Sequence, residues 1–292
     1  MISKALQQWQ ANGRYFDWQS QSIFYRDQGE GETLLCLHGF PTASFDWQGM
    51  WPSLTKHFRV ISLDLLGFGF SSKPRGNHYS VLQQTDIISA LLASLKIKRA
   101  HILAHDLGDS IAQECLARHE TFPSENGFEI QSICYLNGGL FPETHRPRLI
   151  QTLLRGPLGP LLVYGLKETK FRSSFSAVFG ADTQPSSQDL SDFWHLIELN
   201  QGHRLAHRLL QYIPERKKHR ARWLNAMLST QVPMRLVNGL DDPVSGRHML
   251  ERYCELIPRA DVVGLEGIGH YPQVEAPGAV LAAFLDFQKK IP

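Results

Sequence analysis

Short apolar runs that alternate with segments of helical period are the feature that most limits the possible folds of this chain. Each run ends in Gly, Asp or His, and a segment with helical spacing follows several of them, as expected for a parallel sheet flanked by helices. Two earlier runs, at 15–18 and 22–29, predict an opening hairpin. We therefore predict an α/β fold with a mostly parallel central sheet. The runs span residues 33–39, 59–65, 99–106, 130–138, 233–239 and 260–270, and the clearest helices span 82–95, 110–118, 246–256 and 277–289.

The alternation stops between about residues 140 and 223. Prolines punctuate helical stretches there, and no apolar run of strand length appears. This pattern of prolines and helical stretches predicts two parts. A core is formed by 1–139 and 224–292, and a helical cap, or lid, is inserted at 140–223 after the sixth core strand. Insertions at the carboxyl ends of strands commonly cover the ligand site.

Composition favours a small-molecule partner. The chain has 292 residues, 42% of them hydrophobic, which is enough for a large core. Its 30 basic and 28 acidic residues leave a formal charge of +2, too weak a field to suggest nucleic acid or a membrane surface as a partner. We interpret the basic run ERKKHRARW at 215–223 as a solvated helix face. The oligomeric state does not follow from the sequence.

The cysteines and the hydropathy pattern predict a soluble, cytoplasmic protein. No stretch approaches the roughly 20 apolar residues of a spanning helix, so we expect no membrane segment. No His or Cys spacing resembles a metal site, and the glycine loop at 67–72 runs into a Lys-Pro pair that breaks the helix a dinucleotide site needs. We therefore expect no cofactor. Four cysteines fall in apolar stretches, as buried free thiols do in a reducing compartment: Cys36, Cys115, Cys134 and Cys254.

Residues 104–108, AHDLG, have the spacing of a nucleophile elbow. Small residues two before and two after Asp106 allow a strand to turn sharply into a helix and expose the central side chain. Asp106 takes the place of the serine in G-x-S-x-G. The backbone N–H groups of Leu107 and Phe40 could form an oxyanion hole beside it. An aspartate that caps the following helix is the alternative interpretation.

Chain order supports the elbow. Nucleophile, acid and histidine follow one another in sheets of this kind, and Asp106, Asp242 and His270 each lie at the end of an apolar run in that order. Asp241 is the rival for the acid, and we prefer Asp242 because it stands three residues after Gly239 and directly before a proline. On its own, the Asp-Pro pair is equally consistent with a turn.

An aspartate nucleophile suits displacement at a saturated carbon. A carboxylate with a reference pKa of about 3.9 is ionised at neutral pH, so it can attack without a base and form an alkyl ester. Water activated by His270, with Asp242 holding its tautomer, can then hydrolyse that ester. Epoxides and alkyl halides fit this scheme.

Five motifs carry a resemblance to a known family: HGFPTASFDW, DLLGFGFSSKP, AHDLGDS, GLDDP and GIGHYP. Together they resemble the Asp-nucleophile branch of the α/β-hydrolase superfamily, the epoxide hydrolases and haloalkane dehalogenases. The segments NGGLFPETHRP and LLQYIPERKKHRARW are similar to those of the mesoderm-specific transcript proteins. The resemblance implies an α/β-hydrolase fold with a lid and a hydrolase of the epoxide-hydrolase type. A haloalkane dehalogenase and a non-catalytic binding protein of the same fold are the alternatives.

The resemblance also implies roles for lid residues. Epoxide hydrolases use lid tyrosines to protonate the opening oxygen, and Tyr212 resembles one of these, with Tyr164 as a candidate for the second. Dehalogenases place side-chain donors where this chain has Phe40 and Leu107, which disfavours halide chemistry. Asp109 departs from the family pattern, because a small residue is expected there and a second carboxylate would perturb the pKa of Asp106 or narrow the site.

Overall fold

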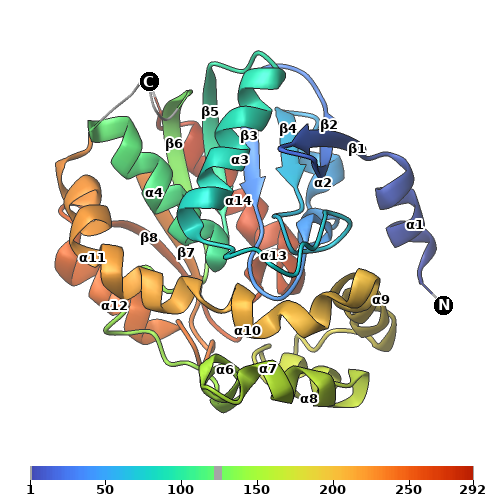
Figure 1. Cartoon of the computed structure of the whole chain (residues 1–292). Coiled ribbons are helices and arrows are strands. Elements are labelled where there is room, and N and C mark those ends of the chain that lie inside the picture. The colour runs from blue at the N-terminus through green and yellow to red at the C-terminus, as the bar shows by residue number, and fades with distance from the viewer. Residues whose placement is uncertain (1, 122–126, 292) are drawn as a thin grey trace.

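The computed structural model describes residues 2–121 and 127–291. Figure 1 shows one central sheet with α3 and α4 on one face and α14 on the other. Its strand order is β1-β2-β4-β3-β5-β6-β7-β8. β2 pairs antiparallel with both β1 and β4, and the pairs from β4 to β8 are all parallel. The strands are β1 Arg14–Trp18, β2 Gln21–Gln28, β3 Thr33–Leu37, β4 Arg59–Leu63, β5 Arg99–Ala104, β6 Glu129–Tyr135, β7 Met234–Gly239 and β8 Asp261–Leu265.

This topology confirms the predicted α/β-hydrolase fold. Every predicted apolar run contains one strand, and the two earliest runs form the hairpin. α4 begins at 107, three residues before its predicted start, because the chain turns directly from β5 into the helix. The helices are α1 Lys4–Ala11, α2 Trp51–Leu54, α3 Val81–Ser94, α4 Leu107–Thr121, α6 Leu149–Arg155, α7 Gly159–Leu162, α8 Glu168–Ser176, α9 Ser187–Glu198, α10 Ala206–Leu209, α11 Tyr212–Ser229, α12 Arg247–Leu256, α13 Pro272–Glu275 and α14 Pro277–Gln288.

The hydrophobic core lies on both faces of the sheet. Successive side chains of a strand point to opposite faces, so neighbouring residues of β5 enter different buried clusters. Ile102 packs in the cluster that includes Ile111 of α4, and Leu103 packs in the cluster that includes Phe284 of α14. Burial on both faces holds the strand ends in fixed positions, which positions any group that follows them.

The segment from β6 to β7 contains helices and no strand. Figure 1 shows α6 to α10 below the sheet, on the side to which the arrow of β3 points, and α11 beside α4. α11 packs against α4 and continues to Ser229, so the expected boundary at 223 falls inside a helix. The carboxyl ends of the strands therefore face the helical segment.

The structure also bears on the expected burial of the cysteines and on the expected absence of a membrane segment. All four cysteines are free, and three are buried, but Cys254 on α12 is exposed, so its predicted burial was wrong. In the described part of the chain, no helix combines the length and the apolar character needed to cross a bilayer.

Candidate active site

Asp106 lies at a tight turn between β5 and α4. Its φ is 50°, a left-handed conformation that residues with side chains rarely adopt. A Cβ at Gly108 would lie 2.5 Å from the Leu37 carbonyl oxygen, so glycine is needed for α4 to start this close to β3. The turn directs the Asp106 carboxylate beyond the strand ends instead of along its own helix.

The Asp106 carboxylate is bound by three groups from distant segments. The backbone N–H of Phe40 donates to Oδ2 at 3.0 Å, and the Tyr212 hydroxyl lies 3.4 Å from the same oxygen. Arg216 Nη2 donates to Oδ1 at 3.0 Å. No amide of α4 bonds to the carboxylate within the described residues, so the geometry does not support the helix-cap interpretation.

His270 and Asp242 form a buried pair. Asp242 follows β7 and His270 follows β8, and His270 Nδ1 lies 2.7 Å from Asp242 Oδ2. The side chain of Asp241 is exposed, so the histidine is bonded to the aspartate that directly precedes Pro243. The structure thus brings together the three groups that chain order singled out.

A polar cradle holds the Asp242 carboxylate in place. The Ser245 hydroxyl donates to Oδ2 at 2.7 Å, the Val244 N–H donates to Oδ1 at 2.7 Å, and the Asn137 amide donates to Oδ2 at 3.1 Å. Asn137 thus lies behind the acid and helps to fix its orientation.

Burial and charge set opposing trends in the pKa values of this trio. Burial acts to raise the pKa of Asp106, but Arg216, His270 and His105 together hold it below its ordinary value. Burial likewise opposes ionisation of Asp242, yet His270 and two hydrogen-bond donors lower its pKa to about 2. Burial acts to lower the pKa of His270, and the Asp242 and Asp106 carboxylates outweigh it and raise that pKa. Both carboxyl groups are therefore held in their ionised forms.

Backbone N–H groups surround Asp106 as an oxyanion hole requires. The Phe40 N–H already bonds to the carboxylate. The Leu107 N–H is the first of α4 and has no partner within the described residues. A helix N-terminus favours negative charge, so both amides can stabilise an oxyanion at this point.

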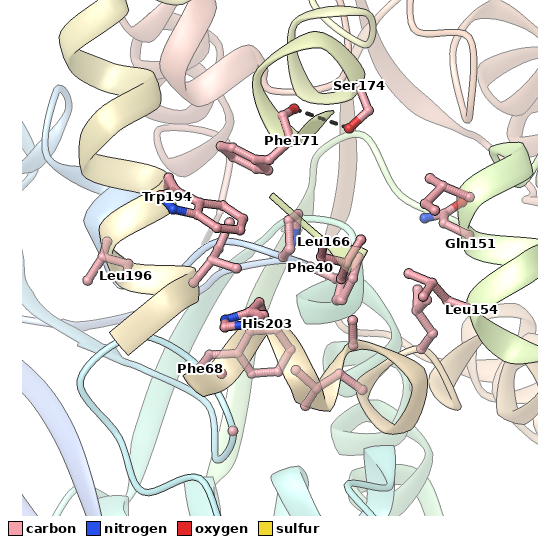
Figure 2. Close-up of a pocket in the computed structure, with 18 of the residues that line it drawn as sticks. Phe40, Phe68, Gln151, Leu154, Leu166, Phe171, Ser174, Trp194, Leu196 and His203 are labelled. Atoms are coloured by element: carbon pink, nitrogen blue, oxygen red, sulfur yellow. Dashed lines mark hydrogen bonds between the residues drawn. The ribbon is translucent and has the colours of Figure 1, made fainter. Parts of the chain in front are cut away.

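Two adjoining cavities open over the site. The smaller, of about 100 Å³, is lined by Asp106 and His270. The larger, of about 320 Å³, shares the walls of Phe40, Ile150 and Phe171 with it. Figure 2 shows mostly aromatic and aliphatic side chains converging on the larger cavity. Within residues 2–121 and 127–291, no group of three or more His, Cys, Asp or Glu side chains could hold a metal ion.

Comparison with known proteins places the chain in a family. Residues 34–284 match the model of the alpha/beta hydrolase family. The chain belongs to this family. It is 43% identical over 297 residues to the mesoderm-specific transcript homolog protein of Homo sapiens, covering 98% of this chain and 88% of that protein. The resemblance read from the motifs is thus confirmed.

More distant relatives of this α/β hydrolase are named for different reactions. It is 28% identical over 278 residues to the cis-3-alkyl-4-alkyloxetan-2-one decarboxylase of Shewanella oneidensis, covering 91% of this chain and 84% of that one. The solved haloalkane dehalogenase DatA from Agrobacterium tumefaciens C58 superposes with a TM-score of 0.79 at 19% identity, over 96% of this chain and 97% of that one. The solved structure supports the fold alone.

The two expected lid tyrosines of the hydrolase lie in different places. Tyr212 is buried at the start of α11, with its hydroxyl near Asp106. Tyr164 is 67% exposed, stacks on Arg204 and lines neither cavity. The structure therefore places Tyr212, but not Tyr164, beside Asp106.

Arg216 is the site residue that sequence reasoning missed. Its side chain is 1% exposed, and besides the Asp106 carboxylate it binds the Asp106 carbonyl oxygen at 2.7 Å and the Ser110 hydroxyl at 2.7 Å. The guanidinium also lies 4.6 Å from the ring centre of Tyr212. Four residues separate Tyr212 and Arg216 on α11, so they share one helix face, and that spacing was the available signal.

The basic run on α11 was expected to be a solvated helix face, but the structure shows that several of its side chains are paired. Arg220 pairs with Glu143 at 2.7 Å, and Arg222 pairs with Glu114 at 3.2 Å. Glu114 also accepts a hydrogen bond from the buried Trp223 indole at 2.8 Å. Every arginine in the run is therefore bound to a carboxylate elsewhere in the fold.

Asp109 is fully buried one helical turn from the nucleophile position. Neither carboxyl oxygen has a hydrogen-bond partner of normal geometry within the described residues, although backbone of Leu136 lies close. Burial raises the pKa of Asp109 well above its ordinary value, the Asp106 charge adds to this, and Arg216 opposes it only in part. The pKa values of Asp109 and Asp106 are therefore shifted in opposite directions.

Proposed function

We propose that this α/β hydrolase acts through a covalent alkyl ester on Asp106, with an apolar epoxide as its substrate. The observation that carries this proposal is an ionised carboxylate at the wall of a cavity that it shares with the His270–Asp242 pair. Residues 140–223 act as the cap that closes the cavity. The location in the cytoplasm, supported by three buried free thiols, is part of the same proposal.

In the first half-reaction, Asp106 opens the ring. A carboxylate oxygen attacks one epoxide carbon, the bond between that carbon and the ring oxygen breaks, and the oxygen takes a proton from the Tyr212 hydroxyl. Burial raises the pKa of Tyr212 well above its ordinary value, so the phenol holds its proton until the ring opens. The product of this half-reaction is a hydroxyalkyl ester of Asp106.

In the second half-reaction, water cleaves the ester. His270 takes a proton from water, which attacks the Asp106 carbonyl carbon, and the Phe40 and Leu107 amides stabilise the oxyanion. Collapse of this intermediate breaks the ester bond, and the leaving alkoxide takes the proton from the His270 imidazolium to give the diol. The proton left on the Asp106 carboxyl group returns to the Tyr212 phenolate, which restores the carboxylate, the phenol and the neutral imidazole. Asp242 stabilises the imidazolium throughout.

The walls of the larger cavity indicate an apolar substrate. Most of the lining residues are apolar and include Phe68, Leu154 and Trp194, and three lysines are among the polar ones. The site suits alkyl halides less well, because Phe40 and Leu107 have no side-chain hydrogen-bond donor for a departing halide.

A strained lactone ring is a second candidate. The relative from Shewanella is named for an oxetan-2-one with two alkyl groups, and the same displacement at a saturated ring carbon would open such a ring. Its leaving group is a carboxylate, which needs no proton from Tyr212. Comparing both rings against the same variants separates the two candidates.

Isotope labelling tests the covalent route. In a single turnover in ¹⁸O-water, label should enter the Asp106 carboxylate, and label in the product alone would contradict the proposal. His270→Gln should accumulate a protein whose mass has increased by that of the substrate, and Asp106→Asn should not. An unmodified His270→Gln protein, after incubation with a substrate that the wild type consumes, would exclude the mechanism. Absence of turnover across epoxides, lactones and halides would favour a binding protein of the same fold.

A further inference from the structure

The outer side of α6 and α7 exposes an unusual number of large apolar side chains. Among the described residues, seven of the nine exposed large hydrophobic side chains lie between 149 and 164. Monomeric proteins rarely leave such a cluster in water unless it has a partner. We define the apolar ridge as Leu149, Leu153, Leu158, Leu161, Leu162 and Tyr164.

Helical spacing separates the ridge from the cavity. Leu149 and Leu153 are four residues apart and share the outer face of α6, with exposures of 75% and 48%. Ile150 and Leu154 have the same spacing on the adjacent face and line the larger cavity. Figure 2 shows Leu154 directed toward that cavity, and Figure 1 shows α6 and α7 at the edge of the molecule farthest from the sheet. One short helix therefore borders the cavity on one side and solvent on the other.

The charges in the segment that carries the ridge are almost all positive. Between residues 144 and 181 the only acidic residue is Glu168, and it is paired with Arg172 at 2.9 Å. The remaining basic residues of this segment form no ion pair within the described part of the chain. They are Arg146, Arg148, Arg155, Lys167 and Lys170. The formal charge of +2 for the whole chain conceals this local excess.

We propose that the apolar ridge docks on the surface of an anionic lipid bilayer. Apolar side chains that enter the headgroup region, flanked by lysine and arginine, are the pattern by which proteins bind such surfaces without spanning them. A second copy of the chain fits less well, because a symmetric contact would bring the unpaired basic residues of both copies together. Docking also brings the cavity wall formed by Leu154 and Leu166 close to the lipid, from which an apolar substrate can enter.

Vesicle flotation tests the proposal without any turnover. The full chain should bind vesicles of phosphatidylcholine and phosphatidylserine, bind pure phosphatidylcholine vesicles weakly, and dissociate in high salt. Leu149→Ser, Leu153→Ser and Leu161→Ser should each weaken binding about tenfold, given the free energy of burying a leucine. The matched control is Leu228→Ser on α11, a half-exposed leucine outside the ridge, which should bind as the wild type does.

Charge variants keep the test valid if a leucine variant fails to fold. The pair Lys167→Gln and Lys170→Gln should lower affinity for anionic vesicles about fivefold per residue. Lys217→Gln and Lys218→Gln, which remove the same charge from exposed positions on α11, should have no such effect. Asp106→Asn should bind vesicles normally, so a failed chemical mechanism and a failed docking surface give different results.

Three outcomes would overturn the proposal. The wild type could fail to bind anionic vesicles, or Leu228→Ser could lose as much affinity as the ridge variants. Alternatively, sedimentation could show a dimer that the ridge substitutions convert to a monomer, which would assign the surface to a second copy of the chain.

Discussion

Arg216 and Asp106 form a buried ion pair that joins α11 to the turn after β5. Nη2 lies 3.0 Å from Oδ1 and 2.7 Å from the Asp106 carbonyl oxygen, and both side chains are almost fully buried. The arginine therefore restrains the backbone and the carboxylate of one residue together. It also fixes the start of α11, and with it Tyr212, against the site.

Arg216→Gln should destabilise the protein strongly. Removing one partner of a buried pair leaves an uncompensated charge, which typically costs about 3–5 kcal/mol. Urea unfolding measures this, with Arg220→Gln as the control from a half-exposed pair with Glu143, expected to cost about 1 kcal/mol or less. In the same variant, the loss of the arginine raises the pKa of Asp106, so the acidic limb of ester formation should move to higher pH. An unchanged limb would show that Arg216 does not control the ionisation of Asp106.

The sequence locates the trio because each member lies at or shortly after the end of an apolar run. Asp106, Asp242 and His270 could be located from strand ends alone, since parallel strands bring their carboxyl ends to one edge. Arg216 could not be located in that way, because it lies on a helix whose position depends on packing against α4. Its basic neighbours made the segment look solvated, and the carboxylates that bind them come from other parts of the chain.

The cap is also a region where the sequence predicts the secondary structure but not the tertiary packing. Its helical character follows from the prolines and the missing apolar runs, but which face of each short helix meets the cavity is decided by tertiary packing. For that reason Tyr212 was placed correctly near Asp106, while Tyr164 turned out to be exposed. The net charge of the whole chain was also a poor guide to its possible partners, because a sum over 292 residues hides a locally basic segment.

The pH dependence of ester hydrolysis should differ from that of the free protein. Burial acts to lower the pKa of His270, but Asp242 and Asp106 outweigh it and raise the pKa above its ordinary value in the free protein. Esterification removes the Asp106 charge and lowers that pKa, which favours the neutral imidazole that acts as the base. Single-turnover rates should therefore show an acidic limb for hydrolysis below the His270 pKa that NMR finds in the free protein.

Asp242→Asn provides the matched variant for this pH dependence. Losing the carboxylate that supports the imidazolium should move the limb to still lower pH and reduce the hydrolysis rate by about 10⁴-fold. A limb that stays in place would mean that another group acts as the base.

Tyr212→Phe should distinguish epoxide opening from the alternatives. A positioned general acid contributes about 10²–10⁴-fold, so ester formation from an epoxide should slow by that factor. Alkyl halides and oxetan-2-ones release stable anions and should react at nearly the wild-type rate. Tyr253→Phe is the control, because Tyr253 is also a buried tyrosine but lies on α12, where its hydroxyl has no hydrogen-bond partner among the residues that the structure describes. Equal losses for all substrates would indicate that Tyr212 positions Arg216 instead of donating a proton.

Asp109→Asn should change how stability depends on pH. Burial raises the pKa of Asp109 in the folded state, so the folded protein keeps a proton that the unfolded chain loses. Its contribution to stability is complete below the unfolded pKa of about 3.9 and declines by about 1.4 kcal/mol per pH unit as the pH rises toward the folded value. The variant lacks this loss, so its stability relative to the wild type should rise as the pH increases above about 4.

Asp242→Asn should show the opposite sign in the same unfolding experiment. Burial opposes ionisation of Asp242, but His270 and the donors around it lower its folded pKa to about 2, so its contribution is present above about pH 3.9 and is lost as the pH falls toward 2. The wild type should therefore lose stability relative to this variant on acidification. Urea unfolding of the three proteins across this pH range checks both signs at once. If the Asp109→Asn difference does not change with pH, the carboxyl is ionised in the folded state, and Arg216 then balances two charges instead of one.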